Sequence, residues 1–117
     1  MKILIGQIFL ITTVILQSCS EEIIAFKGKE NKSVSVEAGK RFIIVLQENH
    51  AKGQNWRCIT NNETKIAEYI KANYHGAETG DIDFVFETKG KGNTTIKFNL
   101  VEYSNVVDSC SVEVEVK

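Results

Sequence analysis

The sequence predicts an all-β domain of about seven to eight short strands that fold into an antiparallel sandwich. Apolar and polar residues alternate along its clearest segment, where Val112, Val114 and Val116 are separated by glutamates. Turns that carry glycine, such as residues 89–93, separate the candidate strands. The 117 residues leave room for one domain once a processed segment is removed.

Residues 1–20 read as an export signal rather than as part of that domain. An almost unbroken apolar run, residues 3–16, follows a single lysine and is too short to span a membrane comfortably. Ser18 and Ser20 occupy the small-residue positions in front of a cut after Ser20. We therefore expect a signal peptide over residues 1–20 and a secreted domain over residues 21–117.

A second interpretation of the same segment is lipid anchoring. The run Leu16-Gln17-Ser18-Cys19 is similar to the lipobox of bacterial lipoproteins, in which the cysteine becomes the lipidated first residue. Gln17 is unusual inside such a box, and both interpretations remain open. Only lipidation of Cys19, at the cell envelope, would give the domain a membrane partner.

The candidate strands follow one another with turns between them. In chain order, seven of them are residues 23–26, 33–37, 41–47, 54–60, 82–88, 94–103 and 108–116. A turn at Ala38-Gly39 separates the second from the third, and the polar residues 48–53 separate the third from the fourth. The glycine-bearing residues 89–93 make a hairpin of the fifth and sixth.

Residues 66–74 form the ambiguous segment. Ile66, Tyr69, Ile70 and Tyr74 fit helical spacing, but predicted strands on both sides favour a strand. The number and length of the strands then indicate an immunoglobulin-like antiparallel β-sandwich.

Charge and composition exclude several classes of function. Removal of Lys2 leaves 13 of the 14 basic residues against 15 acidic ones, a net charge of 13 − 15 = −2. No basic stripe with interleaved aromatic residues is present, so we expect no nucleic acid partner. The chain has no close pair of cysteines or histidines, so we expect neither a metal site nor a cofactor.

The chain is also not expected to be an enzyme. His50 and His75 both fall in predicted loops, where a histidine is usually solvated. No serine or cysteine lies in a recognisable nucleophile elbow, and no glycine-rich phosphate loop follows a strand.

The two cysteines of the domain are expected to point inward. Cys58 shares a strand face with Trp56, and Cys110 has the same parity as the valines of the last strand. In an oxidising compartment this arrangement predicts a Cys58–Cys110 disulfide. The alternative is two buried thiols that behave as small hydrophobic side chains.

Three sequons place possible glycosylation sites at Asn31, Asn62 and Asn93, in predicted loops or at strand edges. They have meaning only if the chain is exported through a eukaryotic secretory pathway.

The polar residues 48–53 are the leading candidate for a binding function. They lie between two predicted core strands, and such a scaffold fixes what a loop presents.

The spacing of the turn, loop and tryptophan resembles that of the chagasin-type inhibitors of papain-like cysteine proteases. Gly39 supplies the turn glycine, Trp56 follows Gly53 at the family's interval, and Gly92 matches the family's hairpin glycine. The resemblance covers residues 32–117, nearly the whole secreted domain.

The resemblance assigns three protease-binding loops. In chain order they are Asn49-His50-Ala51-Lys52-Gly53-Gln54, Gly76-Ala77-Glu78-Thr79-Gly80 and Glu102-Tyr103-Ser104. It implies a monomer whose three loops form a wedge at one end of the sandwich. The wedge would enter the cleft of a papain-like, cathepsin L-type endopeptidase and block it reversibly, with the first loop over the catalytic thiolate.

The sequence departs from the family pattern at the loop tips. His50, Ala51 and Lys52 replace a proline and two threonines, Glu102 replaces an arginine, and the chain contains no proline. An alternative is therefore a non-inhibitory binding or adhesion module, secreted or lipid-anchored, on the same scaffold.

Overall fold

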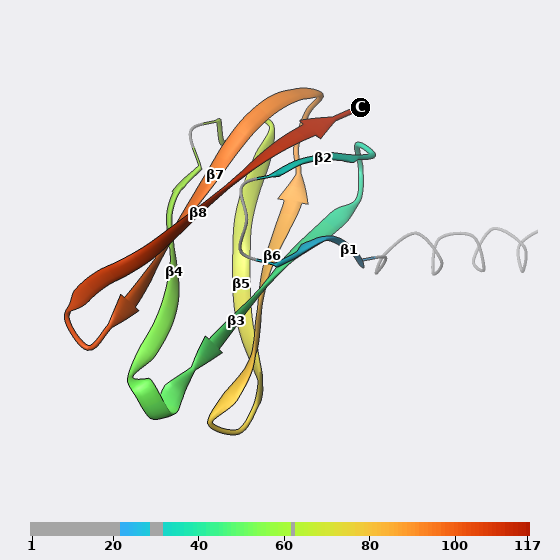
Figure 1. Ribbon diagram of the computed structural model, residues 1–117. Helices are drawn as coiled ribbons and strands as arrows, with labels where there is room; N and C mark the ends of the chain where they lie inside the picture. Colours follow the sequence, from blue (N-terminus) through green and yellow to red (C-terminus); the bar gives the residue numbers. More distant parts are fainter. Residues whose placement is uncertain (1–21, 29–31, 62) are drawn as a thin grey trace, which may run out of the picture.

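The computed structural model describes residues 22–28, 32–61 and 63–117. Within these ranges the chain forms eight strands and one short 3-10 helix, arranged as two four-stranded sheets packed face to face (Figure 1). The predicted immunoglobulin-like β-sandwich is confirmed. In the described ranges, no helix combines the length and apolar character needed to cross a bilayer.

Several sequence-based expectations fall outside the described residues. The export signal over residues 1–20, Cys19 and the sequon asparagines Asn31 and Asn62 all lie there. Asn93 is described, and its side chain is exposed near the start of its strand. The signal, the lipid anchor and the glycans remain predictions.

The first sheet has the strand order β1-β3-β6-β5. Its strands are β1 (Glu22–Lys27), β3 (Arg41–Asn49), β6 (Thr79–Thr88) and β5 (Ala67–Gly76). Strand β6 pairs antiparallel with both β3 and β5, whereas β1 pairs parallel with β3.

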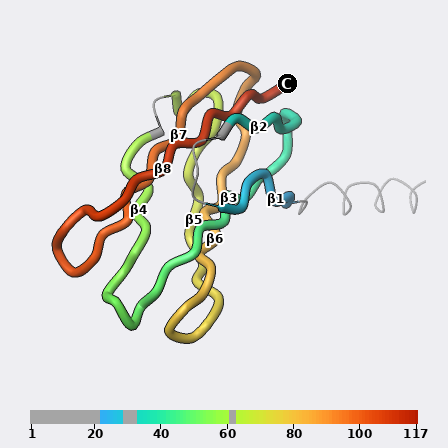
Figure 2. The backbone as a smooth tube through the Cα atoms, in the orientation of Figure 1, coloured from blue at the N-terminus to red at the C-terminus, as the bar shows by residue number. Residues whose placement is uncertain are grey.

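The second sheet has the order β2-β8-β7-β4. Its strands are β2 (Lys32–Val36), β8 (Asn105–Val116), β7 (Gly92–Glu102) and β4 (Gln54–Asn61). Strand β7 pairs antiparallel with β4 and β8, and β2 pairs parallel with β8. The parallel pairs were not expected. Strands β1 and β2 are neighbours in the chain but belong to different sheets, so neither pairs with the other. Figure 2 shows β1 beside its parallel partner β3.

The core lies between the two sheets. On β3 the side chains of Phe42, Ile44 and Leu46 are fully buried, as the period of a strand requires. Across the interface, Phe84 of β6 meets Phe98 of β7 with ring centroids 4.9 Å apart. Each buried side chain of this size stabilises the fold by about 1.5–3 kcal/mol relative to exposure.

The ambiguous segment 66–74 contributes a strand, β5, at the edge of the first sheet. Its register shifts between Tyr69 and Lys71, where a bulge adds one residue to β5. Because the bulge breaks the strict alternation of a strand, the apolar residues of β5 fall at spacings that also fit a helix.

The predicted disulfide is wrong. Cys58 of β4 lies opposite Phe98 of β7, and Phe98 lies opposite Cys110 of β8, so a whole strand separates the two cysteines. Two strand spacings amount to about 9.6 Å, whereas a disulfide requires Cα atoms within about 7 Å of each other. Both side chains do pack toward the core, as expected, and no disulfide joins them.

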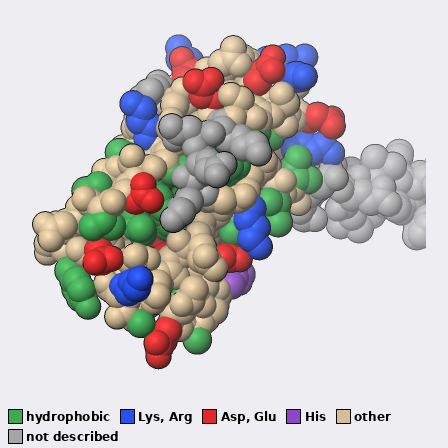
Figure 3. All heavy atoms as spheres, viewed as in Figure 1, with side chains coloured by type: hydrophobic (Ala, Val, Ile, Leu, Met, Phe, Trp, Pro, Cys, Tyr) green, Lys and Arg blue, Asp and Glu red, His purple; other side chains and the backbone are tan. Residues whose placement is uncertain are grey.

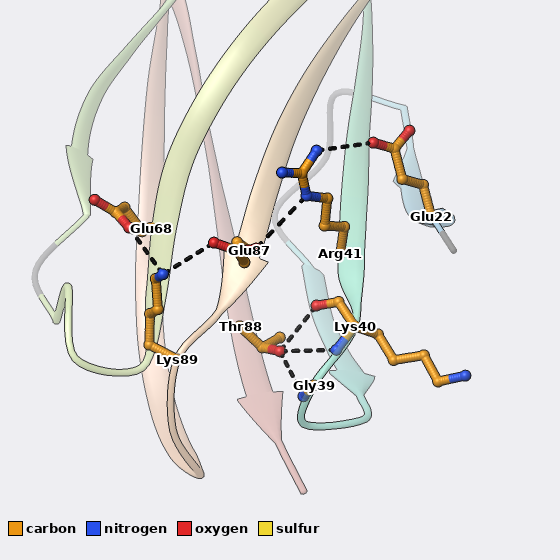
Figure 4. Close-up of polar contacts among 8 residues, drawn as sticks. All are labelled: Glu22, Gly39, Lys40, Arg41, Glu68, Glu87, Thr88 and Lys89. Atoms are coloured by element: carbon orange, nitrogen blue, oxygen red, sulfur yellow. Dashed lines mark hydrogen bonds and ion pairs between the residues drawn. The ribbon is translucent and has the colours of Figure 1, made fainter. Parts of the chain in front are cut away.

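A charged row crosses the outer face of the first sheet (Figure 4). Arg41 of β3 contacts Glu22 of β1 at 3.5 Å and Glu87 of β6 at 3.7 Å. Lys89 contacts the same Glu87 at 2.9 Å and Glu68 of β5 at 3.4 Å. The Lys89 hydrogen bond and charge, with a smaller effect of Arg41, hold the pKa of Glu87 below its ordinary value.

Thr88, at the end of β6, fastens the turn between β2 and β3. Its buried hydroxyl accepts hydrogen bonds from the backbone N–H groups of Gly39 (2.8 Å) and Lys40 (3.0 Å). The same hydroxyl donates to the carbonyl of Lys40 at 2.8 Å (Figure 4). This turn lies at one end of the sandwich, because β3 begins there and β6 ends there.

Candidate functional site

The three predicted loops lie together at the opposite end of the sandwich. Strands β3, β5 and β7 all end there, and β4, β6 and β8 begin there (Figure 1). We refer to residues 49–54 as the first loop, residues 76–80 as the second loop and residues 102–104 as the third loop. The structure brings all three together through hydrogen bonds between them.

The first loop is a single turn of 3-10 helix, η1 (His50–Lys52). Asn49 caps it, because its side-chain oxygen accepts a 2.9 Å hydrogen bond from the backbone N–H of Ala51. Gly53 closes the turn in the left-handed region, with φ of 69°, and its N–H donates to the carbonyl of His50. The exposed Ala51 and Lys52 form the tip. Strand β3 thus runs to Asn49, two residues further than predicted.

The third loop is bonded to the first. The backbone N–H of Tyr103 donates to the carbonyl of Gly53 at 3.0 Å. The side-chain NH2 group of Gln54 donates to Oε1 of Glu102 at 3.1 Å. The side-chain oxygen of Gln54 accepts from the backbone N–H of Asn49 at 3.1 Å. The Gln54 amide therefore holds both ends of the first loop against the third.

The second loop contacts the first from the other side. The backbone N–H of His50 donates to the carbonyl of Glu78 at 2.5 Å, and Asn49 lies opposite Thr79 across β3 and β6. Ala77 and Glu78 form the two-residue turn. At Gly80 a Cβ would come within 2.7 Å of the Tyr74 hydroxyl and would also overlap the His75 carbonyl, so only glycine fits there.

Glu48, which the sequence placed in the polar loop 48–53, belongs to β3 and lies beneath the first loop. Its side chain is 2% exposed, and both of its oxygens have partners. Oε1 accepts the backbone N–H of Trp56 at 2.7 Å, and Oε2 lies 2.6 Å from Nε2 of His50. Glu48 has the same parity as Phe42 and Leu46, so strand alternation alone predicts that it points inward.

Tyr74, also absent from the prediction, links the first loop to the second. Its ring stacks on His50 with centroids 4.1 Å apart and planes 21° from parallel. Its hydroxyl donates a 2.7 Å hydrogen bond to the carbonyl of Ala77. Desolvation raises the pKa of this phenol, and the carboxylates of Glu48 and Asp81 raise it further, so the hydroxyl keeps its proton.

An apolar surface lies beside the three loops. Tyr103 is 75% exposed and has φ of 58°, a rare value for a residue other than glycine. Val106 and Val107, on the first residues of β8, are 59% and 50% exposed. Figure 3 shows hydrophobic side chains over the hairpin formed by β7 and β8. Neither valine was among the predicted site residues, although two successive valines outside a core strand are a usable signal.

A groove of about 590 Å³ runs along one side of the first loop. Lys52 and Trp56 line it, together with Lys27 of β1 and Asp81 of β6, which form an ion pair at 3.4 Å. Because charged side chains and Trp56 line it together, the groove is suited to contact a partner next to the loop tip.

The histidines do not assemble a catalytic centre. His50 is held by Glu48 and Tyr74, and His75 contacts Asp83 at 2.8 Å on an exposed surface. Among residues 22–28, 32–61 and 63–117, no group of three or more histidines, cysteines and carboxylates is arranged to hold a metal ion.

No family model and no curated protein matches this sequence. Three solved structures share its fold, and each aligns with 84% of this chain. The cysteine protease inhibitor EhICP2 from Entamoeba histolytica is 13% identical, with 99% of its chain covered and a TM-score of 0.67. Amebosin is 14% identical, with 100% covered and a TM-score of 0.60. PbICP-C, solved in complex with falcipain-2, is 11% identical, with 98% covered and a TM-score of 0.51.

These similarities concern the fold, because all three identities are below 15%. One neighbour, EhICP2, is a cysteine protease inhibitor, and another, PbICP-C, was solved with falcipain-2, so the resemblance indicated by the loop spacing is confirmed at the level of the fold.

Proposed function

We propose that this chain is a secreted, reversible inhibitor of papain-like cysteine endopeptidases of the cathepsin L type. One observation carries the proposal: three loops lie together at one end of the sandwich, and backbone hydrogen bonds join the first loop to the second and to the third. The proposal is supported by the shared fold with EhICP2, a cysteine protease inhibitor, and with PbICP-C, which binds falcipain-2.

In this proposal the first loop is the centre of the wedge. Its tip, Ala51 and Lys52, enters the cleft over the catalytic thiolate. Proteases bind their substrates as extended strands, whereas η1 presents these peptide bonds in a tight helical turn. The loop therefore occupies the cleft without offering a bond in a cleavable conformation.

The second and third loops grip the walls of the cleft. Ala77 and Glu78 project on one side of the first loop, and Tyr103 and Ser104 project on the other. Glu102 is held by Gln54 and acts mainly by fixing the first loop. Bonds within and between the loops reduce the conformational entropy that binding would otherwise lose.

Inhibition of papain by the purified protein tests this function. We expect a reversible loss of activity on titration, whereas no inhibition at micromolar concentration would favour a binding or adhesion module on the same scaffold. Lys52→Ala should raise the apparent dissociation constant by about tenfold, since tip contacts dominate such interfaces. Lys91→Ala, an exposed lysine at the other end of the sandwich, is the matched control and should have no effect.

Secretion is tested separately by the intact mass of the exported protein. A chain that begins at Glu21 supports a secreted inhibitor. A chain that begins at a diacylated Cys19 would instead mean that the inhibitor is anchored at the cell envelope.

A further inference from the structure

We infer that Glu48 is a positioning residue that fixes the inhibitory tip through a relay of Glu48, His50 and Tyr74. The relay acts on the site of the proposed function and rests on that function for its biological meaning. Glu48 is buried and cannot touch a protease, so any effect it has on binding must pass through the residues that it holds.

The first step of the relay is the buried carboxylate. A carboxylate that is 2% exposed destabilises a fold unless its oxygens are hydrogen-bonded. Here one oxygen is bonded to the start of β4 through the N–H of Trp56, and the other is bonded to the ring of His50. Glu48 therefore ties the first loop to β4 through its two oxygens.

The second step is the imidazole ring. His50 contacts Glu48 through Nε2 and lies flat against Tyr74 of β5. Its own backbone N–H donates to the carbonyl of Glu78. One residue of the first loop is thus held from beneath by β3, from the side by β5 and from the tip of the second loop.

The third step reaches the second loop. The hydroxyl of Tyr74 donates to the carbonyl of Ala77, the first residue of the two-residue turn. The relay consequently connects the core strand β3 to the tips of two loops. A displacement of His50 changes the support of both.

The relay adds rigidity to loops that contain no proline. The chain contains no proline, so no pyrrolidine ring restricts φ in any of the three loops. Loop residues have few buried apolar contacts to hold them. Side-chain contacts of Glu48, His50 and Tyr74 take that role.

Hydrogen exchange in the free protein tests the relay without a protease. The reporters are the amides of Ala51 and Gly53, which are hydrogen-bonded only while η1 is formed. His50→Ala should accelerate their exchange by about tenfold. In this variant, opening of η1 no longer has to break the contacts of His50 with Glu48 and Tyr74, so it costs less free energy. His50→Phe keeps an aromatic ring against Tyr74 but cannot bond to Glu48, and should accelerate them as well.

Two comparisons make this result specific. Amides of the core residues Ile96 and Phe98 should exchange at unchanged rates in both variants. His75→Ala, which breaks the exposed contact with Asp83 at the same end of the sandwich, should leave the Ala51 and Gly53 rates unchanged. Rates within about twofold of wild type in His50→Ala and His50→Phe would overturn the relay.

Inhibition kinetics then test whether the relay affects binding to a protease. Glu48→Ala, shown to be folded by the fluorescence of the single tryptophan, should inhibit papain about tenfold more weakly through faster dissociation. Equal inhibition by wild type and Glu48→Ala would refute the positioning role. If wild type does not inhibit papain but exchange responds as expected, the relay stands and the proposed function fails. If Glu48→Ala does not fold, Tyr74→Ala, on an edge strand, replaces it with the same expectation.

Discussion

The ring of Tyr103 lies against the α-carbon of Gly53, where an added Cβ would stand 2.6 Å from the nearest ring atom. The same two residues are joined by the hydrogen bond from the Tyr103 N–H to the Gly53 carbonyl. The first and third loops are therefore interlocked at a point where only a residue without a side chain fits. This contact allows the roles of the loops to be separated by mutation.

Gly53→Ala should weaken both the fold and inhibition. The substitution forces a side chain into the left-handed region, which costs about 1–2 kcal/mol, and it also displaces Tyr103. We expect a lower midpoint in urea unfolding and a higher apparent dissociation constant for papain, both measured on the same purified protein.

Gly39→Ala is the matched control for this change. Gly39 has a similar positive φ of 85°, but no atom lies within 4 Å of the position its Cβ would take. It should lose stability through backbone strain alone and inhibit as wild type does. An equal loss of inhibition in Gly39→Ala would show that the contact between Gly53 and Tyr103 has no separate role.

Thr88→Val should destabilise the protein without changing inhibition. The variant keeps the shape of the side chain but leaves the N–H groups of Gly39 and Lys40 without their buried acceptor, at a cost of about 1–3 kcal/mol. Thermal unfolding measures the loss. Thr95→Val, a half-buried position within β7, carries the same chemical change and should shift the midpoint much less. Equal shifts in the two variants would contradict the role given to the Thr88 hydroxyl.

Glu87 should contribute a pH-dependent part of the stability. Its pKa is lower in the fold than its ordinary value of 4.5, so its contribution is complete above that value and is lost as the pH falls through the lower pKa of the folded state. Glu87→Gln should therefore be less stable than wild type at pH 6, and the gap should narrow at pH 3. Urea unfolding at both pH values checks this, with Glu113→Gln as the control for the charge change. A gap that does not depend on pH would contradict the assignment.

The thiol of Cys58 should react slowly with maleimides in the folded protein. Burial raises the pKa of Cys58 to about 11, which leaves about one thiolate in a thousand at pH 8. Burial also raises the pKa of Cys110. In urea without reductant, both residues should gain one label each in the intact mass. Ser109→Cys adds an exposed cysteine on β8 that should react at once. If neither Cys58 nor Cys110 gains a label in urea, the two residues are joined by a disulfide and the assignment of free thiols is wrong.

Strand identity could be predicted wherever one face of a strand is buried. Phe42, Ile44 and Leu46 alternate with more exposed residues, and the structure confirms β3 and the valines of β8 as predicted. The order of strands within the sheets could not be predicted, because pairing partners such as β2 and β8 are distant in the sequence. For the same reason parity placed Cys58 and Cys110 on the correct faces but could not reveal that β7 lies between them.

The loops could be located from spacing, but the contacts that hold them could not. Gly53 and Gly80 are recognisable as turn residues from the sequence alone. Glu48 follows the predicted end of its strand and was placed in a polar loop, although its parity with the core residues of β3 places it on their buried face. Tyr74 carries no usable signal, because the bulge after Tyr69 changes the face on which later residues of β5 lie.

The position of β8 also bears on the order of folding during synthesis. Strand β8 is the last of the eight in chain order, and it is the neighbour of both β2 and β7. Until residues 105–116 leave the ribosome, β2 has no strand to pair with and Phe98 lacks the cover of Cys110. The nascent chain therefore exposes apolar residues of β7 to chaperones and proteases until β8 is made.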